Sequence, residues 1–266
     1  MMDRLRRDLR GIYTIWYRDV LRFVRDRVRI VASLAQPALY LFVFGAGLAP
    51  AISGLGGGEI DFTQFVFPGI LAMAVLFTSI FSAISIVWDR EFGFLKEVMV
   101  APVSRTAVAL GKVAGGSTVA VFQGLLVLAF APILGVQLSV GQILLIISLM
   151  LLLAAMMTAL GILVAVRQRT LEGFQVLMNF LVLPMFFLSG AFFPLNSAPA
   201  WLRTLSRFDP MTYGVDALRQ VTLWQNVSPA ALQELRLFPI GVDVTIMAGL
   251  FVLFLTPAVW LFSRQD

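Results

Sequence analysis

Residues 113–166 read VAGGSTVAVFQGLLVLAFAPILGVQLSVGQILLIISLMLLLAAMMTALGILVAV, and none of these side chains is charged. Lys112 precedes the run, Arg167 follows it, and a polar break at 135–139 divides it into two halves. The hydrocarbon core of a bilayer is about 30 Å thick, and a helix needs roughly 20 apolar residues to cross it. Each half meets that length. The run therefore predicts two membrane-crossing helices joined by a tight turn.

The composition of the whole chain agrees with an integral membrane protein. Of its 266 residues, 59% are hydrophobic and 13% are charged, whereas soluble domains average about 25% charged residues. Mean hydropathy is +0.91. Cysteine and histidine are absent, which excludes disulfides, thiolate metal sites and a histidine general base. The length favours a single membrane domain, and the charged first 29 residues argue against a cleavable signal peptide.

Six apolar segments predict an all-α integral membrane fold with six transmembrane helices. A helix is expected because lipid cannot satisfy backbone N–H and C=O groups. Nine of the twenty Lys and Arg residues precede the first segment, and none lies in the connections 51–64 and 135–139. Because positive residues stay on the cytoplasmic side, both termini are predicted inside. The segments are 30–50, 65–88, 113–134, 140–166, 174–193 and 240–262.

Residues 1–29 predict an amphipathic helix that lies in the membrane interface. Apolar residues recur there at helical spacing, and arginines line another face. Tyr13, Trp16 and Tyr17 would then lie at headgroup depth. Two interpretations remain open: a plain topology anchor, or a surface helix that also contacts a cytoplasmic partner. The partner contacts would be Arg18, Arg22 and Arg25.

The connection at about 89–101 mixes charged and apolar residues and predicts a short cytoplasmic helix. Pro102 disfavours helical structure in the residue before it, so the helix should end there. Ser104 is placed to cap the next helix. An isolated helix of about ten residues is marginal in water, so neighbouring helix ends or a partner protein must hold it. The alternative is an ordinary cytoplasmic loop.

The segment at about 194–239 contains five prolines and two amphipathic pieces, 201–205 and 211–219. Broken helices are tolerated at membrane depth where protein buries them. We predict that the segment re-enters the outer leaflet before the last span. The alternative is an amphipathic cap that lies flat on the outer surface.

Small residues at helical spacing and several phenylalanines occur in or beside the predicted spans. Gly111 and Gly115 form a GxxxG step, extended by Gly116 and Ala120, which favours close helix packing within the chain or at a dimer seam. Six phenylalanines could line an apolar substrate path, or could simply pack or face lipid. They are Phe42, Phe44, Phe77, Phe81, Phe186 and Phe187.

Several chemistries lack the residues that they need. Ionisable residues of the spans (Lys112, Glu172 and Asp243) lie near span ends rather than at mid-depth, which disfavours an ion-coupled carrier. Ser189 has no histidine base, and no G-x-x-x-x-G-K-[ST] loop is present. The chain is therefore predicted not to be an enzyme. Any ATP would be bound by a separate subunit.

The chain resembles the permeases of ABC exporters of the second type, which include drug-resistance permeases and polysaccharide-export permeases. The resemblance covers essentially the whole chain. It rests on the interfacial helix, six spans with both ends inside, and a series of motifs in the family's order. These motifs are REFG at 90–93, APVS at 101–104, LSGAFFP at 188–194, PAWL at 199–202, DPMTY at 209–213 and DALR at 216–219.

The resemblance implies a homodimer of permeases with two copies of an ABC ATPase, in a bacterial plasma (inner) membrane. No cofactor would bind directly, ATP and Mg²⁺ would act through the partner, and nucleic acid is not expected.

Residues 1–29 would be the interfacial helix and 30–266 the permease domain. The substrate route would run between protomers, lined by the first, second and fifth spans. The implied coupling helix contacts the ATPase through Arg90, Glu91, Gly93, Phe94, Lys96 and Glu97. The implied outer gate contains Ser189, Gly190, Pro194, Trp201, Asp209, Pro210 and Tyr213.

The substrate class is left open by the sequence. A path rich in phenylalanine and poor in charge favours an amphiphilic drug or a lipid-like molecule. The alternatives are a lipid-linked saccharide or polysaccharide and, from a different class of protein, a membrane assembly subunit that transports nothing.

Overall fold

A computed structural model describes residues 2–43, 61–92 and 103–263, and every regular element in these ranges is helical. The predicted all-α architecture is therefore confirmed for the described residues. The long helices, with α4 as the continuation of α3, are α1 (Met2–Arg25), α2 (Arg27–Phe42), α3 (Phe62–Ser82), α4 (Ile84–Glu91), α6 (Arg105–Leu128), α7 (Val140–Ala165), α8 (Leu171–Leu188) and α12 (Ile240–Ser263). The helices of the connections are η4 (Ala131–Leu134), η5 (Leu195–Ser197), α9 (Ala200–Phe208), α10 (Pro210–Leu223) and α11 (Pro229–Leu235).

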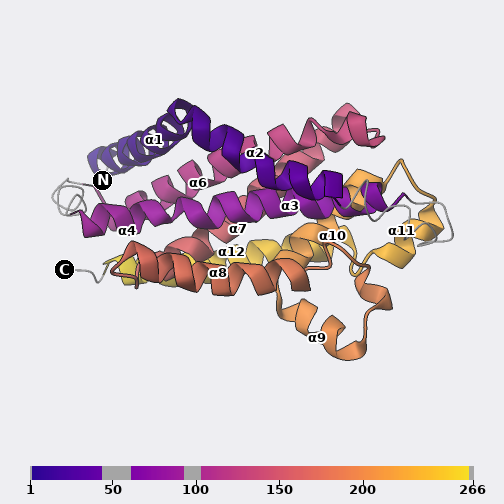
Figure 1. The fold of residues 1–266 in the computed structure, drawn as a ribbon. Coiled ribbons are helices and arrows are strands. Elements are labelled where there is room, and N and C mark those ends of the chain that lie inside the picture. The colour runs from indigo at the N-terminus through magenta and orange to yellow at the C-terminus, as the bar shows by residue number, and fades with distance from the viewer. Residues whose placement is uncertain (1, 44–60, 93–102, 264–266) are drawn as a thin grey trace.

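The long helices form an elongated bundle with two distinct ends (Figure 1). The start of α1, the end of α4 and the end of α12 lie at one end, called the α1 end below. The short helices α9, α10 and α11 gather toward the other, called the α10 end. The first and last described helices therefore have their terminal residues at the same end of the bundle, the α1 end.

Five helical segments of the described chain are long and apolar enough to cross a membrane. They correspond to the second to sixth predicted spans. The first predicted span is described only up to residue 43, and its apolar helix covers Ile30–Phe42. The five segments are Phe62–Glu91, Arg105–Leu128, Val140–Ala165, Leu171–Leu188 and Pro229–Leu261.

The hairpin predicted in the uncharged run is confirmed. After α6, the 3-10 turn η4 ends at Gly135, whose φ of 74° lies in the left-handed region that suits glycine. Ser139 then caps α7: its hydroxyl accepts from the backbone N–H of Gln142, and Gln142 bonds back to the Ser139 N–H. Local signals thus specify this turn, and the side chains of Gln64 and Asn226 also bind its backbone.

The helices that carry the third and fifth predicted spans differ in extent from the apolar segments. The third span lies in α6, which begins at Arg105, as the predicted cap at Ser104 indicated. The Ser104 hydroxyl accepts from the Ala107 N–H, and Lys112 in the turns before 113 is buried. The fifth span ends at Leu188 rather than 193. There Gly190 adopts a φ of 73°, and a side chain at that position would collide with Leu195.

The added turns of α6 pack against α1. A Cβ at Gly111 would approach Ile15 to 2.9 Å, and one at Gly115 would approach Asp19 to 3.0 Å. The Trp16 indole N–H donates to the Thr118 hydroxyl at 3.0 Å. The GxxxG step is therefore used for packing within the chain. Leu5, Leu9, Tyr13 and Tyr17 form the exposed face of α1.

The centre of the bundle is an apolar scaffold in which α3 contacts α6 and α7 closely. The contact with α7 depends on Gly161, because a Cβ there would lie 2.7 Å from the backbone oxygen of Ile80. By contrast, α12 exposes large apolar side chains, including Val252, Leu253 and Trp260, as expected for a lipid-facing helix.

We expect Gly161→Ala to destabilise the fold. The added methyl meets backbone rather than a movable side chain, so α3 and α7 must separate, at a cost of about 1–3 kcal/mol. Gly249→Ala is the matched control, because nothing lies within 4 Å of its Cβ position. That variant should gain up to about 1 kcal/mol of helix propensity. Thermal unfolding in detergent measures both, and equal melting temperatures would contradict the packing argument.

Candidate functional site

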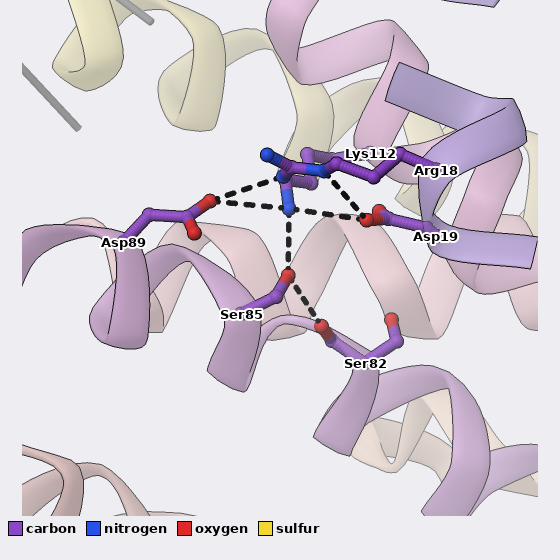
Figure 2. Close-up of polar contacts among 6 residues, drawn as sticks. All are labelled: Arg18, Asp19, Ser82, Ser85, Asp89 and Lys112. Carbon is purple, nitrogen blue, oxygen red and sulfur yellow. Dashed lines mark hydrogen bonds and ion pairs between the residues drawn. The ribbon is translucent and has the colours of Figure 1, made fainter. Parts of the chain in front are cut away.

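A buried lysine joins three helices at the α1 end (Figure 2). The side chain of Lys112, from α6, is only 6% exposed. Its Nζ donates to the Ser85 hydroxyl of α4 at 2.8 Å. It also lies 3.5 Å from the carboxylates of Asp19 in α1 and Asp89 in α4. The ammonium is thus surrounded by acceptors from both neighbouring helices.

Arg18 completes a charge-balanced cluster. Its guanidinium lies 3.2 Å from Asp89 and 3.7 Å from Asp19. Two cations therefore meet two carboxylates. Removing one partner from such a buried network leaves a charge uncompensated, which costs far more than a surface pair is worth. The cluster consequently holds α1 and α4 in a defined position on α6.

A second polar junction connects α4 to α8. The Glu91 carboxylate accepts from the backbone N–H of Leu171 at 3.0 Å, and the Arg90 guanidinium donates to the Gln168 carbonyl. Leu171 is the first residue of α8, which Thr170 caps. A carboxylate at a helix N-terminus is favoured by the helix dipole. Arg90 and Glu91 therefore bind the start of the fifth span.

The three arginines predicted to contact a partner lie along one open groove. This groove has a volume of about 690 Å³ and is lined by Arg18, Arg22, Arg25, Asp26 and Asp89, together with Leu21. Arg18 is engaged in the Lys112 cluster. Arg22 lies over the Trp88 ring, 6.0 Å from its centroid.

Most of the predicted coupling helix lies outside the described residues, including Gly93, Phe94, Lys96 and Glu97. Arg90 and Glu91 are described, and they stand where the chain leaves α4 for this segment. Phe44 of the predicted substrate path is also outside the described residues.

The predicted outer-gate residues assemble at the α10 end. Ser189 is buried and donates to the Phe186 carbonyl at 2.6 Å. Asp209 caps α10 through the Met211 N–H, and Pro210 occupies the first turn. Tyr213 donates to the Arg207 carbonyl. Pro194 precedes η5, and Trp201 is 65% exposed on α9.

The helix α10 is buried from Met211 to Leu223 and packs against α3, α7 and α12. Arg219 is 3% exposed; it donates to the Gly190 carbonyl at 2.7 Å and lies 4.1 Å from the centre of the Phe65 ring. These contacts attach α10 to the turn that follows α8.

Sequence reasoning missed the polar core beside Arg219. Gln220 donates to the Asp243 carboxylate at 3.1 Å, and Asp216 accepts from the backbone N–H groups of Leu237 and Phe238. The signal was available, because charged and amide side chains inside an apolar stretch must find partners. Which partners they find depends on the packing of α10 against α12.

Five of the six phenylalanines of the predicted path lie in the described residues. Phe77 and Phe81 of α3 stack on each other with centroids 6.2 Å apart, and Phe77 also meets Phe186. Phe186 is 1% exposed and therefore belongs to the core, and the ring of Phe187 lies 5.5 Å from it. Phe42 and Phe187 are more than half exposed on the bundle surface. The structure thus groups Phe77, Phe81, Phe186 and Phe187, and the substrate path stays a prediction.

The polar side chains of these sites bind other helices of the bundle. In the described part of the chain, no group of three or more His, Cys, Asp or Glu side chains is arranged to hold a metal ion. The polar contacts instead tie helix ends together at both faces of an apolar bundle. The class defined by this fold and these sites is a polytopic membrane protein whose helix ends are linked by polar junctions.

Residues 10–223 match the family model described as ABC-2 type transporter, and the chain belongs to that family. The resemblance that the motifs indicated is thereby confirmed. The chain is a transport permease of the ABC-2 type.

Curated relatives match over most of their own length. "Putative transport permease ycf38" of Cyanophora paradoxa is 28% identical over 90% of this chain and 83% of its own. "Inner membrane transport permease YadH" of Escherichia coli (strain K12) is 27% identical over 82% of this chain and 85% of its own. "Nodulation protein J" of Rhizobium leguminosarum bv. trifolii is 28% identical over 80% and 81%, respectively.

We expect Lys112→Met to loosen α1. The substitution removes the buried cation and leaves Asp19 and Asp89 with the partly exposed Arg18 alone, at a cost of roughly 3 kcal/mol. Hydrogen exchange should therefore accelerate in α1 more than in α7. Arg207→Met, which removes an exposed cation from α9, is the control and should leave α1 unchanged. Unaltered exchange in α1 of the Lys112 variant would show that the cluster does not hold this helix.

Proposed function

We propose that this chain is the membrane subunit of an ATP-driven exporter and that a separate ABC ATPase docks at the α1 end. Permeases of this family normally work with such an ATPase. In this proposal the α1 end faces the cytoplasm of a bacterial cell, and the permease is a homodimer that carries two ATPase subunits. The inner-membrane relative supports the choice of membrane, and the arginine-rich face of α1 supports the orientation.

One observation carries the coupling mechanism: the bond between Glu91 and the N-terminus of α8. A helix is stiff along its axis, so displacement of its first residue is transmitted to its last. At the other end of α8, the Leu188 carbonyl accepts from Ser206 of α9, and the next turn is bound by Arg219 of α10. ATPase movement at the predicted coupling helix would thereby reach the outer-gate residues through α8.

A conformational change requires contacts that differ in free energy between the two states. The Glu91 bond is exposed to water, unlike the buried Lys112 cluster. We infer that Lys112 keeps α1 and α4 together as one body, while the Glu91 junction transmits that body's movement to α8.

The cargo that we favour is an amphiphilic drug or a lipid-like molecule. Apolar side chains dominate the exposed faces of α2 and α8, including Val31, Phe42, Phe180 and Phe187. Two such faces, from two protomers, would form a route that suits a hydrocarbon portion better than a bare sugar.

The proposal is tested by reconstituting the chain with a cognate ABC ATPase in proteoliposomes. We expect the two proteins to copurify with equal numbers of subunits and amphiphiles to stimulate ATP hydrolysis. A screen over lipids, drugs and glycolipids assigns the cargo. Stimulation by glycolipids alone would replace our cargo with a lipid-linked saccharide. Failure of every cognate ATPase to bind would overturn the exporter assignment.

Charge reversal of Glu91 tests the coupling route. In Glu91→Lys, an ammonium replaces the carboxylate at the α8 N-terminus, and loss of the cap and dipole interaction costs about 1–2 kcal/mol. We expect export to fall about tenfold or more while the permease still inserts and basal ATP hydrolysis persists. Transport and ATPase assays on the same proteoliposomes measure both activities.

Glu172→Lys is the matched control for this experiment. Glu172 also lies in the first turn of α8 and is exposed, so its reversal changes the same helix dipole interaction without breaking a contact to α4. Export should remain coupled in that variant. Normal export by Glu91→Lys would disprove the route through α8.

A further inference from the structure

A pocket with a volume of about 170 Å³ lies between α2 and α3, which pack side by side (Figure 1). Phe23 of α1, Met73 and Phe77 provide its large apolar side chains. Phe77 also belongs to the predicted substrate path. A cavity of about 150 Å³ holds a molecule as small as benzene. The pocket therefore has room for one small group of a ligand, while the rest of the ligand stays outside it.

No charged side chain lines this pocket. The sequence of α2 is uncharged from Ile30 to Phe42, and that of α3 is uncharged throughout. A charged group of a ligand would lose its hydration here without gaining a counter-charge, which is strongly unfavourable. The group that enters the pocket is therefore uncharged.

The amide of Gln36 is exposed at this pocket. Within residues 2–43, 61–92 and 103–263, it has no hydrogen-bond partner. An amide has two N–H donors and an acceptor oxygen, and lipid tails can satisfy none of them. Because Gln36 lies in the first predicted span, its amide calls for a polar partner from outside the described chain.

A backbone carbonyl and a hydroxyl add to this polar wall. Pro37 has no N–H, so the Ser33 carbonyl does not receive the helical hydrogen bond that residue 37 would otherwise donate. The Thr78 hydroxyl has no partner among the described residues, whereas the Thr118 hydroxyl donates to the carbonyl four residues before it. The Ser33 hydroxyl is different, because it already donates to Gln123 at 2.7 Å.

These three groups match a ligand hydroxyl. A hydroxyl can donate to the Ser33 carbonyl while it accepts from the Gln36 amide or the Thr78 hydroxyl. An ester or an ether can only accept, so it would leave the Ser33 carbonyl without a donor. Buried polar groups without partners reduce affinity, and the pocket should therefore discriminate a free hydroxyl from a blocked one.

The depth of the pocket also favours an uncharged group. A helix rises about 1.5 Å per residue, so Gln36 lies roughly 14 Å along α2 from Arg27. With the α1 end toward the cytoplasm, the pocket would lie in the inner half of a hydrocarbon core about 30 Å thick. A phosphate would have to leave the headgroup region to reach it, whereas a hydroxyl attached to a hydrocarbon portion can enter at a smaller cost.

We propose that this pocket binds the hydroxyl of an uncharged amphiphile, of the diacylglycerol or long-chain alcohol type, and that this is the class of cargo taken up from the inner leaflet. The hydroxyl lies between the Ser33 carbonyl and the Gln36 amide, next to Thr78. The hydrocarbon portion leaves the pocket between α2 and α3. The role of the ligand as cargo rests on the proposed exporter function, whereas its binding requires no ATPase.

Binding to the purified full-length chain tests the pocket by itself. The three probes share two octanoyl chains: dioctanoylglycerol, its acetylated analogue with a blocked hydroxyl, and the charged dioctanoyl phosphatidic acid. Titration followed by native mass spectrometry should show about tenfold tighter binding of dioctanoylglycerol than of either analogue, because each analogue loses hydrogen bonds or brings an unpaired charge. Equal binding of all three would indicate an adventitious additive only and would overturn the proposal.

Two conservative variants assign the contacts. Gln36→Leu and Thr78→Val should each weaken dioctanoylglycerol about fivefold and leave the acetylated analogue unchanged, since each removes one hydrogen bond to the hydroxyl. The controls Gln175→Leu in α8 and Thr256→Val in α12 make the same changes at exposed positions outside the pocket lining, and they should bind like the unaltered protein.

Two outcomes of this series would contradict the site. Equal losses in the controls would show a general effect of surface polarity. An altered oligomeric state of Gln36→Leu, with unchanged binding of the probes, would assign the amide to a contact between copies of the chain.

Reconstitution with a cognate ATPase tests the role of the ligand as cargo. Dioctanoylglycerol should stimulate ATP hydrolysis severalfold in the unaltered permease and less in Gln36→Leu, while the acetylated analogue should have little effect. If other amphiphiles stimulate hydrolysis and dioctanoylglycerol binds without doing so, the pocket is not the cargo site, and the exporter assignment stands. If no ATPase associates with the permease, the exporter assignment fails, and the cargo role fails with it. The binding series still decides whether the pocket recognises a hydroxyl.

Discussion

The buried ammonium of Lys112 is the constraint on which the α1 end of this protein depends. A cation placed among apolar helices is tolerated only when carboxylates reach it, and here they come from α1 and α4. Satisfying the charge therefore determines where both helices lie on α6. The first residues of the predicted coupling helix, 89–91, form the end of α4. The Lys112 cluster therefore positions the described start of that segment.

Polar interactions are concentrated at the two ends of the bundle, and an apolar scaffold separates them. At the α10 end, Arg219 performs a role comparable to that of Lys112, since it is buried and binds the carbonyls of the turn after α8. The helix α8 meets both ends, through Glu91 at its start and through Ser206 and Arg219 after it. It is therefore the element best placed to carry displacement between them.

Membership of the ABC-2 family relates the two polar ends of the bundle to transport. Under the proposed function, a partner ATPase would supply mechanical work at one face of the permease, and the permease would change its structure at the other. A buried junction such as the Lys112 cluster stays rigid, so it can pass mechanical work from one helix to the next. A solvent-exposed junction breaks and reforms at a lower free-energy cost, because water replaces the lost bond. The Glu91 contact is of that kind.

The sequence by itself determined the elements whose signals are local. The capped hairpin at Ser139, the helix start at Ser104 and the proline-punctuated helices α9 and α10 were all predictable, because apolar periodicity, caps and prolines act within a few residues. Only the tertiary structure decided the partners of the charged residues. Lys112 meets Asp19 across 93 positions, and Glu91 meets Leu171 across 80. Such pairings depend on the rotation and depth of each helix in the bundle, which follow from close packing at residues such as Gly111 and Gly161 rather than from any local pattern.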